Sequence, residues 1–262
     1  MAAGDTLGKH KHKIAVALVL TFVSGLVDVV GYAGIFHLFV AHVTGVTVHL
    51  GRDIALGRRT DVIAACTIVA AFFLGDVFGR ALIEAGARRR FRNIASVTLG
   101  IQAAMIAIVA VGKVASERSG AASIHGAGHV YAYLAILAGA MGMQTATLTG
   151  VGPLTVHTTF VTGMINKLAQ LVSRILIRGY DFLGGRRDTP EKRAEQSAER
   201  QQAIFISSIW VCYVLGAAAG TASYVKWGLQ ALFVGIAGLV AGIATDLVKP
   251  LSVQEEQQQA ER

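Results

Sequence analysis

Charged residues are scarce in this sequence. Only 15% of its 262 residues are Asp, Glu, Lys or Arg, whereas soluble domains average about 25%. Hydrophobic residues make up 53% of the chain, and the few charges are clustered between long apolar runs. This composition leaves no room for a soluble domain beyond loops and tails, and it predicts a chain that lies largely in a membrane.

Cysteine is nearly absent, and so are the motifs of common enzyme classes. Cys66 and Cys212 each lie within an apolar run, which argues against a disulfide framework or a cysteine-based zinc site. The sequence has no Walker A motif and no zinc-protease, nucleophile-elbow or paired-carboxylate motif. We therefore expect no enzyme activity, no catalytic residue, no metal and no cofactor.

Six apolar runs are long enough to cross a bilayer, which takes roughly 20 residues for each crossing. They are Ile14–Phe36, Val62–Ile83, Ile94–Gly112, Val130–Thr149, Ala203–Tyr224 and Leu229–Val248. We expect an all-α polytopic membrane protein with a single membrane domain over residues 14–248. Residues 1–13 and 249–262 would be a cytoplasmic N-terminal segment and a cytoplasmic tail, and the lipid bilayer would be the main partner.

Basic residues are distributed unevenly between the two sides of the expected membrane domain. If the N-terminus is inside, seventeen Lys and Arg residues fall on the inner side, six fall on the outer side and Arg80 lies within a span. The positive-inside rule then places both termini in the cytoplasm. A basic surface that faces anionic lipid explains the formal net charge of +8, so we expect no nucleic-acid partner.

A short motif occurs twice in the chain. Residues 39–45 have the sequence Phe-Val-Ala-His-Val-Thr-Gly, and residues 157–163 have the sequence His-Thr-Thr-Phe-Val-Thr-Gly. We call these two stretches the Thr-Gly segments. They indicate a duplicated unit, with repeat 1 over about residues 14–112 and repeat 2 over about residues 130–248. Because each unit has three spans, the second must insert upside down, as in many transporters built from inverted repeats.

Each Thr-Gly segment is followed by an apolar run that contains a Gly-x-x-x-Gly motif. The glycines are Gly75 and Gly79 in the first repeat, and Gly216 and Gly220 in the second. Small residues at this spacing let two helices approach closely. We expect a packing role for all four glycines, and we expect the two helices that carry them to meet near the pseudo-two-fold axis.

The apolar runs around the Thr-Gly segments have unusual lengths. Residues 14–50 and 130–165 are each too long for one span and too short for two spans with a turn. We therefore expect one span followed by a broken or re-entrant segment inside the bundle. Residues 167–201 would form a cytoplasmic loop, with a basic amphipathic helix over 167–183 on the inner leaflet and a solvated, flexible stretch over 184–202.

Asp28, Asp76 and Arg80 are charged residues that lie well inside the expected spans. Asp28 has no basic residue within a helical turn. It is a candidate proton or cation site; alternatively, it caps the broken helix near Gly31 or forms a hydrogen bond to a neighbouring span. Asp76 and Arg80 are four residues apart on one helix face, and this spacing predicts a structural ion pair. Arg80 is also near enough to the inner interface to extend its guanidinium toward it.

Polar residues without formal charge concentrate at the Thr-Gly segments. His42 and His157 are candidates for the polar lining of a cavity, and the spacing of the nearby histidines does not match a metal-ligand pair. Hydroxyl, amide and open backbone groups at a helix break can bind a small solute. The expected substrate- or ion-binding residues are therefore Asp28, His42, Thr44, Gly45, Gln144, His157, Thr158, Thr159, Thr162 and Gly163.

These motifs, in this order, resemble a known family. Gly-Leu-Val-Asp at residues 25–28, the two Thr-Gly segments and Gly-Met-Gln at residues 142–144 are similar to the YoaK-type family of uncharacterised bacterial integral membrane proteins. The resemblance covers residues 14–248 and implies a multi-pass protein of about six helices in the bacterial inner membrane. It implies no substrate. Val46 stands where the family usually has Asn, and Asp76 and Arg80 are not part of the shared pattern.

Taken together, these features favour a secondary transporter of an unidentified small solute, with a midplane site built from the Thr-Gly segments and with Asp28 as the coupling group. A passive channel with the same symmetry is the first alternative. A membrane scaffold or regulatory protein is the second. A homo-oligomer remains an open alternative at this level.

Overall fold

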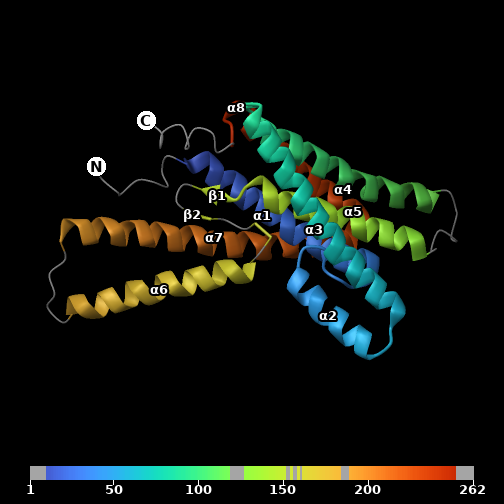
Figure 1. The fold of residues 1–262 in the computed structure, drawn as a ribbon, viewed down its shortest axis with the longest axis horizontal. Helices are drawn as coiled ribbons and strands as arrows, with labels where there is room; N and C mark the ends of the chain where they lie inside the picture. Colours follow the sequence, from blue (N-terminus) through green and yellow to red (C-terminus); the bar gives the residue numbers. More distant parts are fainter. Residues whose placement is uncertain are drawn as a thin grey trace.

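The computed structural model describes residues 10–118, 127–151, 154–155, 158–159, 161–183 and 189–251, and this part of the chain is almost entirely helical (Figure 1). The helices before the midpoint of the chain are α1 (Lys11–Gly31), the π-helical turn η3 (Tyr32–Phe36), α2 (Val43–Ala55), α3 (Arg59–Arg88) and α4 (Ile94–Arg118). The second group is α5 (Ala127–Thr147), α6 (Val161–Leu183), α7 (Pro190–Trp227), the 3-10 turn η4 (Gly228–Ala231) and α8 (Leu232–Val248). A two-residue hairpin of β1 (Gly150–Val151) and β2 (Leu154–Thr155) separates α5 from α6. The expected all-α class is confirmed.

Each of the six expected spans coincides with a helix. Within the described residues, four continuous helical stretches are long and apolar enough to cross a membrane, namely Lys11–Phe36, Arg59–Arg88, Ile94–Gly112 and Lys192–Val248. A single straight helix as long as the last stretch, 57 residues, would measure about 85 Å. The structure divides it at Gly228 into α7 and α8. Helix α5 is not among the four stretches.

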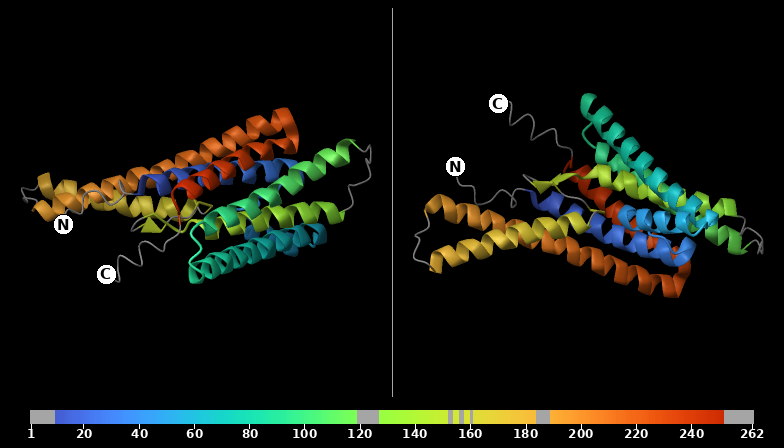
Figure 2. Two further views of the ribbon diagram at one scale, coloured as in Figure 1. Left: turned by 90° about the horizontal axis from the view of Figure 1, so that it is seen from above. Right: turned by 60° about the horizontal axis from the view of Figure 1, so that its bottom comes forward.

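Helices α2 and α6 lie at opposite ends of the bundle. Helix α2 lies beside the first part of α3, and α6 lies beside the first part of α7 (Figures 1 and 2). Helix α1 leads away from the end where α6 lies, and α5 runs back toward that end (Figure 1). The helices that precede α2 and α6 therefore run in opposite directions.

Both Thr-Gly segments fall at a break between two helices, as the lengths of the apolar runs around them predict. Helix α1 ends in η3 and His37, whose φ of 55° is in the left-handed region. The ring of Tyr32 stacks on that of Phe39 at 4.6 Å where the chain turns back. Helix α2 then begins at Val43, one residue before Thr44. Helix α6 begins in the same register, with Val161 one residue before Thr162.

The stretch expected to be a solvated loop is helical over most of its length. Residues 190–202 form the first turns of α7, which begins with Pro190 after the N-cap Thr189. Helix α6 is the expected amphipathic helix, but it begins at Val161 and packs along α7. Its Arg178 binds Glu199 at 2.8 Å and Glu195 at 3.0 Å. Ion pairs between the two helices stabilise a helical hairpin here, which explains why a charged sequence is not a loop.

The expected close packing at the Gly-x-x-x-Gly motif of α3 is against α5. A Cβ atom on Gly75 would collide with the backbone carbonyl of Gly139, and a Cβ atom on Gly142 would collide with the carbonyl of Phe72. One glycine from each helix thus faces the backbone of the other. The two backbones are close because neither helix carries a side chain at the crossing.

The same reciprocal contact joins α7 to α1. A Cβ atom on Gly216 would collide with the backbone carbonyl of Phe22, and one on Gly25 would collide with the carbonyl of Tyr213. Gly79 and Gly220 extend the two contacts by one turn, toward Met143 and Leu26 respectively. The expectation that the two motif-bearing helices meet each other is therefore wrong, because α3 packs against α5 and α7 packs against α1.

We predict that Gly142→Ala and Gly25→Ala each destabilise the protein by about 1–3 kcal/mol, since overpacking forces the backbones apart. Gly100→Ala is the control, because Gly100 lies in α4 and a Cβ atom there would meet nothing within 4 Å. The measurement is thermal unfolding of the detergent-purified protein. Equal melting temperatures for all three variants would contradict the close-packing argument.

Candidate functional site

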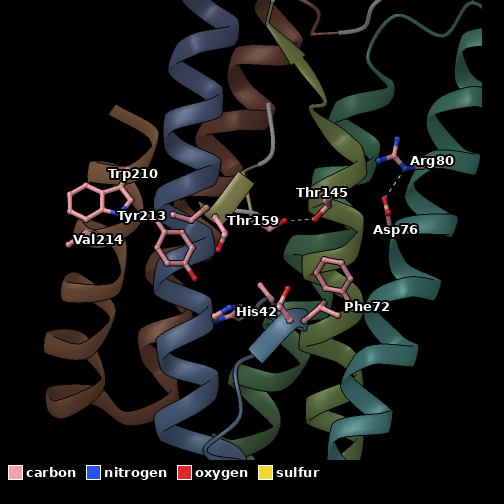
Figure 3. Close-up of a pocket in the computed structure, with 14 residues that line it drawn as sticks. His42, Phe72, Asp76, Arg80, Thr145, Thr159, Trp210, Tyr213 and Val214 are labelled. Atoms are coloured by element: carbon pink, nitrogen blue, oxygen red, sulfur yellow. Dashed lines mark hydrogen bonds and ion pairs between the residues drawn. The ribbon is translucent and has the colours of Figure 1, made fainter. Parts of the chain in front are cut away.

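A cavity of about 640 Å³ lies between the starts of α2 and α6 (Figure 3). Both halves of the chain contribute to its walls. The lining residues are Ala41, His42, Val43, Thr44, Phe72, Asp76, Arg80, Thr145, Thr159, Val161, Thr162, Trp210, Tyr213 and Val214. Of the expected binding residues, the structure thus brings together His42, Thr44, Thr159 and Thr162.

Two helices begin at this cavity. Thr44 and Thr162 are each the second residue of their helix, α2 and α6, and both line the cavity. The first N–H groups of a helix have no partner within it, and they carry a partial positive charge. The side chain of the N-cap residue His42 does not cap α2. The cavity therefore receives hydrogen-bond donors from the backbone as well as from threonine hydroxyls.

Asp28 lies behind the wall of the cavity. Its side chain is only 2% exposed, and its carboxylate accepts the backbone N–H of Ala41 at 2.8 Å and the hydroxyl of Tyr213 at 2.7 Å. Burial of a carboxylate is costly unless such donors satisfy it. Both donors belong to residues that line the cavity. Asp28 thus holds together α1, the break before α2, and α7.

The second half has a neutral interaction at the corresponding place. The hydroxyls of Thr145 on α5 and Thr159 before α6 are 2.7 Å apart. As with Asp28 and Ala41, a residue near the end of the preceding helix binds the segment just before the next helix. The first half achieves this contact with a carboxylate, and the second half achieves it with two hydroxyls.

Asp76 and Arg80 form the expected ion pair. The Nε atom of Arg80 is 3.0 Å from the Oδ1 atom of Asp76, and the two residues are one helical turn apart on α3. Both line the edge of the cavity (Figure 3). The ion pair is therefore part of the candidate site. The sequence indicated the pair but not its place at the cavity.

Gln144 lies away from the cavity, although the sequence suggested it as a solute contact. Its amide nitrogen donates to the carbonyl of Leu20 at 2.7 Å and to the hydroxyl of Ser24 at 2.6 Å. Its amide oxygen accepts a hydrogen bond from Gln102. The residue is fully buried, and it joins α5 to α1 and α4.

Three other candidates, Gly45, Gly163 and Thr158, adjoin residues of the lining without lining the cavity themselves. Gly45 and Gly163 lie in the first turns of α2 and α6, and neither is among the described residues with positive φ. A Cβ atom on Gly45 would come 3.3 Å from the ring of His42, so its small size matters more than its backbone freedom. Thr158 is buried, and its hydroxyl has no hydrogen-bond partner within the part of the chain that the structure describes. His157 lies outside the described residues.

Aromatic residues are the part of the site that sequence analysis missed. Phe72 on α3 and Tyr213 on α7 line the cavity, with Trp210 one turn before Tyr213. One signal could have identified the first two, because each stands three residues before the first glycine of a Gly-x-x-x-Gly motif. Nothing in the sequence shows that this face of each helix turns toward the Thr-Gly segments.

Comparison with known proteins gives one match. Residues 16–245 match the family described as "Protein of unknown function (DUF1275)". No curated protein and no solved structure matches the chain. The family match confirms the resemblance noted in the sequence, because YoaK-type proteins are members of that family.

We predict that Tyr213→Phe lowers the free energy of unfolding by about 1–3 kcal/mol, because the buried Asp28 carboxylate loses a donor. Asp28→Asn should also destabilise, since an amide presents only one acceptor oxygen to two donors. The double variant should lose less than the sum of the single losses, with a coupling of about 0.5–3 kcal/mol. Chemical or thermal unfolding in detergent measures all three.

Tyr131→Phe is the matched control for this double-mutant cycle. The Tyr131 hydroxyl makes a long bond of 3.4 Å to the carbonyl of Thr60 at an exposed position. Its loss should change the free energy of unfolding little. Additive losses for Asp28→Asn and Tyr213→Phe would show that the two side chains do not interact.

Proposed function

Because this chain belongs to the DUF1275 family of proteins of unknown function, its activity must be inferred from its structure, and we propose that it is a secondary transporter of a small solute. The solute site is the cavity between the starts of α2 and α6. The transporter spans the bacterial inner membrane several times, with both termini in the cytoplasm. The proposal includes no catalytic residue, metal or cofactor, and no nucleic-acid partner.

We propose that the membrane domain consists of two inverted three-helix repeats. The spans would be α1, α3 and α4 in the first repeat, and α5, α7 and α8 in the second. The packing pattern supports this division. Helix α3 packs on α5 as α7 packs on α1, and α4 packs on α5 as α8 packs on α1. Helix α2 packs on α3 as α6 packs on α7, while α4 and α8 pack on each other.

In this arrangement α2 and α6 are half-helices that enter from opposite faces of the membrane. Both begin at the cavity, and they extend toward opposite ends of the bundle (Figure 1). Asp28 binds Ala41 within three residues of the Gly25 crossing, so the break before α2 is level with the close contact of α1 and α7. Irregular backbone at membrane depth is tolerated where protein or a watery cavity covers it.

The observation that carries the transport proposal is that the cavity is lined by both halves. Thr44 and Phe72 come from the first half, and Thr162 and Tyr213 come from the second. A rocking motion of one half against the other would expose the same walls first to one side and then to the other. Because Asp28 links the break before α2 to α7, a proton or cation bound there would alter this link and couple the motion to a gradient.

We predict alternating accessibility of the two threonines that begin α2 and α6. Thr44→Cys and Thr162→Cys would be made separately in a background with Cys66→Ser and Cys212→Ser, then labelled from either face with a membrane-impermeant maleimide in oriented vesicles. The maleimide should label each cysteine from both faces of the vesicle. When crosslinking traps the protein in the state that is open to one face, labelling from the other face should fall.

Val46→Cys and Met164→Cys are matched controls, because each lies two residues further along α2 or α6 and is about 1% exposed. They should stay unlabelled. Labelling of Thr44→Cys and Thr162→Cys from both faces at once, unaffected by crosslinking, would indicate a continuous pore and a passive channel. No labelling from either face would contradict transport and favour a scaffold.

The orientation predicts the sidedness of inserted tags. A tag at Arg90, between α3 and α4, and a tag at Pro190, at the start of α7, should both report cytoplasm. Both positions are on the side of the membrane domain that carries most of the Lys and Arg residues. A tag at residue 119, after α4, should report the outside. An outside signal from the Pro190 tag would contradict both the six-span arrangement and the inverted repeat.

A further inference from the structure

We propose that the cavity binds an uncharged, planar aromatic amide or lactam, that is, a ring that carries a carbonyl acceptor and an N–H donor. The inference deepens the proposed function, because it concerns the same cavity. It depends on the walls, the charges and the hydrogen-bonding groups of that cavity. A binding measurement tests it separately from transport.

Aromatic rings form two walls of the cavity. Phe72 on α3 and Tyr213 on α7 face it from opposite sides, with His42 and the Thr145–Thr159 pair between them (Figure 3). Trp210 extends the aromatic surface on the α7 side. Both rings belong to the lining of the same cavity of about 640 Å³. Flat solutes bind well against such ring faces.

The charges around the cavity compensate each other. Arg80 and Asp76 are joined at 3.0 Å, and the carboxylate of Asp28 accepts two hydrogen bonds behind the wall. The partial positive charge at the start of α2 is offset by Asp28, which binds the residue just before that helix's N-cap. The other ionisable groups of the lining are His42 and the phenol of Tyr213, which donates to Asp28. An ion loses its hydration on entry, and Asp76 and Arg80 are already paired with each other, so the cavity favours an uncharged solute.

The hydroxyls of Thr145 and Thr159 are 2.7 Å apart, and either oxygen can be the donor. The Thr145 hydroxyl also lies 3.1 Å from the carbonyl of Met141. Each hydroxyl has two acceptor lone pairs, so the pair offers acceptors to a solute at the cavity wall. The hydroxyls of Thr44 and Thr162, with the first N–H groups of α2 and α6, offer donors. A solute that matches both kinds of group carries an N–H and a carbonyl.

The cavity volume of about 640 Å³ is within the usual range of small-molecule pockets, about 300–1,000 Å³. One or two fused rings fit in this volume.

Four matched probes test the inference on the detergent-purified full chain. Benzamide is the planar neutral amide, benzoate is the same ring with a negative charge, benzylammonium is the same ring with a positive charge, and cyclohexanecarboxamide is the amide without an aromatic ring. Isothermal titration and the shift in melting temperature report binding. Benzamide should bind most tightly, and each other probe should bind at least about threefold more weakly, which corresponds to about 0.65 kcal/mol or more.

Phe72→Leu should weaken benzamide binding about two- to tenfold, the range that an aromatic pair contributes. Phe73→Leu is the matched control, since Phe73 is the next residue on α3, is exposed and does not line the cavity. It should leave benzamide affinity unchanged. Thr162 is an exposed threonine of the lining. Thr162→Val removes its hydroxyl donor, leaves the aromatic walls unchanged and should also weaken benzamide binding. This variant keeps the test decisive if Phe72→Leu does not fold.

Several outcomes would overturn the inference. Tighter binding of benzoate would make the site an anion site at two helix starts, and tighter binding of benzylammonium would make it a cation site. Equal binding of cyclohexanecarboxamide would exclude ring stacking. Equal effects of Phe72→Leu and Phe73→Leu, or no binding of any probe, would exclude this ligand class from the cavity. Benzamide binding without alternating accessibility of Thr44→Cys and Thr162→Cys would preserve the ligand class and reject transport.

Discussion

The close crossing of two pairs of helices is the constraint on which the rest of the structure depends. At Gly25 and Gly216, and at Gly75 and Gly142, backbone faces backbone without an intervening side chain. Helices in a bilayer gain little from apolar burial against each other, so close van der Waals contact is their main source of association. The crossing of α1 and α7 also brings Tyr213, three residues before Gly216, within hydrogen-bond distance of Asp28. A larger residue at Gly25 or Gly216 would therefore disturb the site as well as the packing.

The breaks in the helices are possible because their polar groups find partners. A chain that leaves a helix at membrane depth exposes backbone groups that water cannot reach. In the first half, Asp28 accepts the N–H of Ala41 within this break. The Tyr32 and Phe39 rings stack across the turn. In the second half, the Thr145–Thr159 bond and the β1–β2 hairpin have this role. The cavity is thus formed where two supported breaks meet, and its donors are the starts of the helices that follow.

Much of this arrangement can be predicted from the sequence, because repetition and unusual run lengths are visible in it. Local spacing predicts the all-α class and the ion pair of Asp76 with Arg80. It also predicts the breaks just before the helices that contain Thr44 and Thr162. The partner of each glycine motif could not be predicted, since a Gly-x-x-x-Gly motif indicates close approach but does not identify the neighbour. Gln144 was misplaced for the same reason, because its partners Leu20, Ser24 and Gln102 are distant in sequence. The helical start of α7 depends on ion pairs with α6 that no local pattern reveals.

The two halves have similar packing but different chemistry, and this difference bears on how a gradient could drive the proposed transport. At corresponding places, the first half has the Asp28 carboxylate and the second half has the Thr145 hydroxyl. A carboxylate can gain a proton or bind a cation, whereas a hydroxyl bonded to another hydroxyl stays neutral. In the proposed transport, only the first break would therefore change its interactions when an ion binds, and the Tyr213–Asp28 hydrogen bond would connect that change to α7 of the other half. A single coupling group placed off the symmetry axis makes the two facing directions unequal in energy. The ion gradient sets the direction of the proposed transport, because the group is loaded more often from the side with the higher ion concentration.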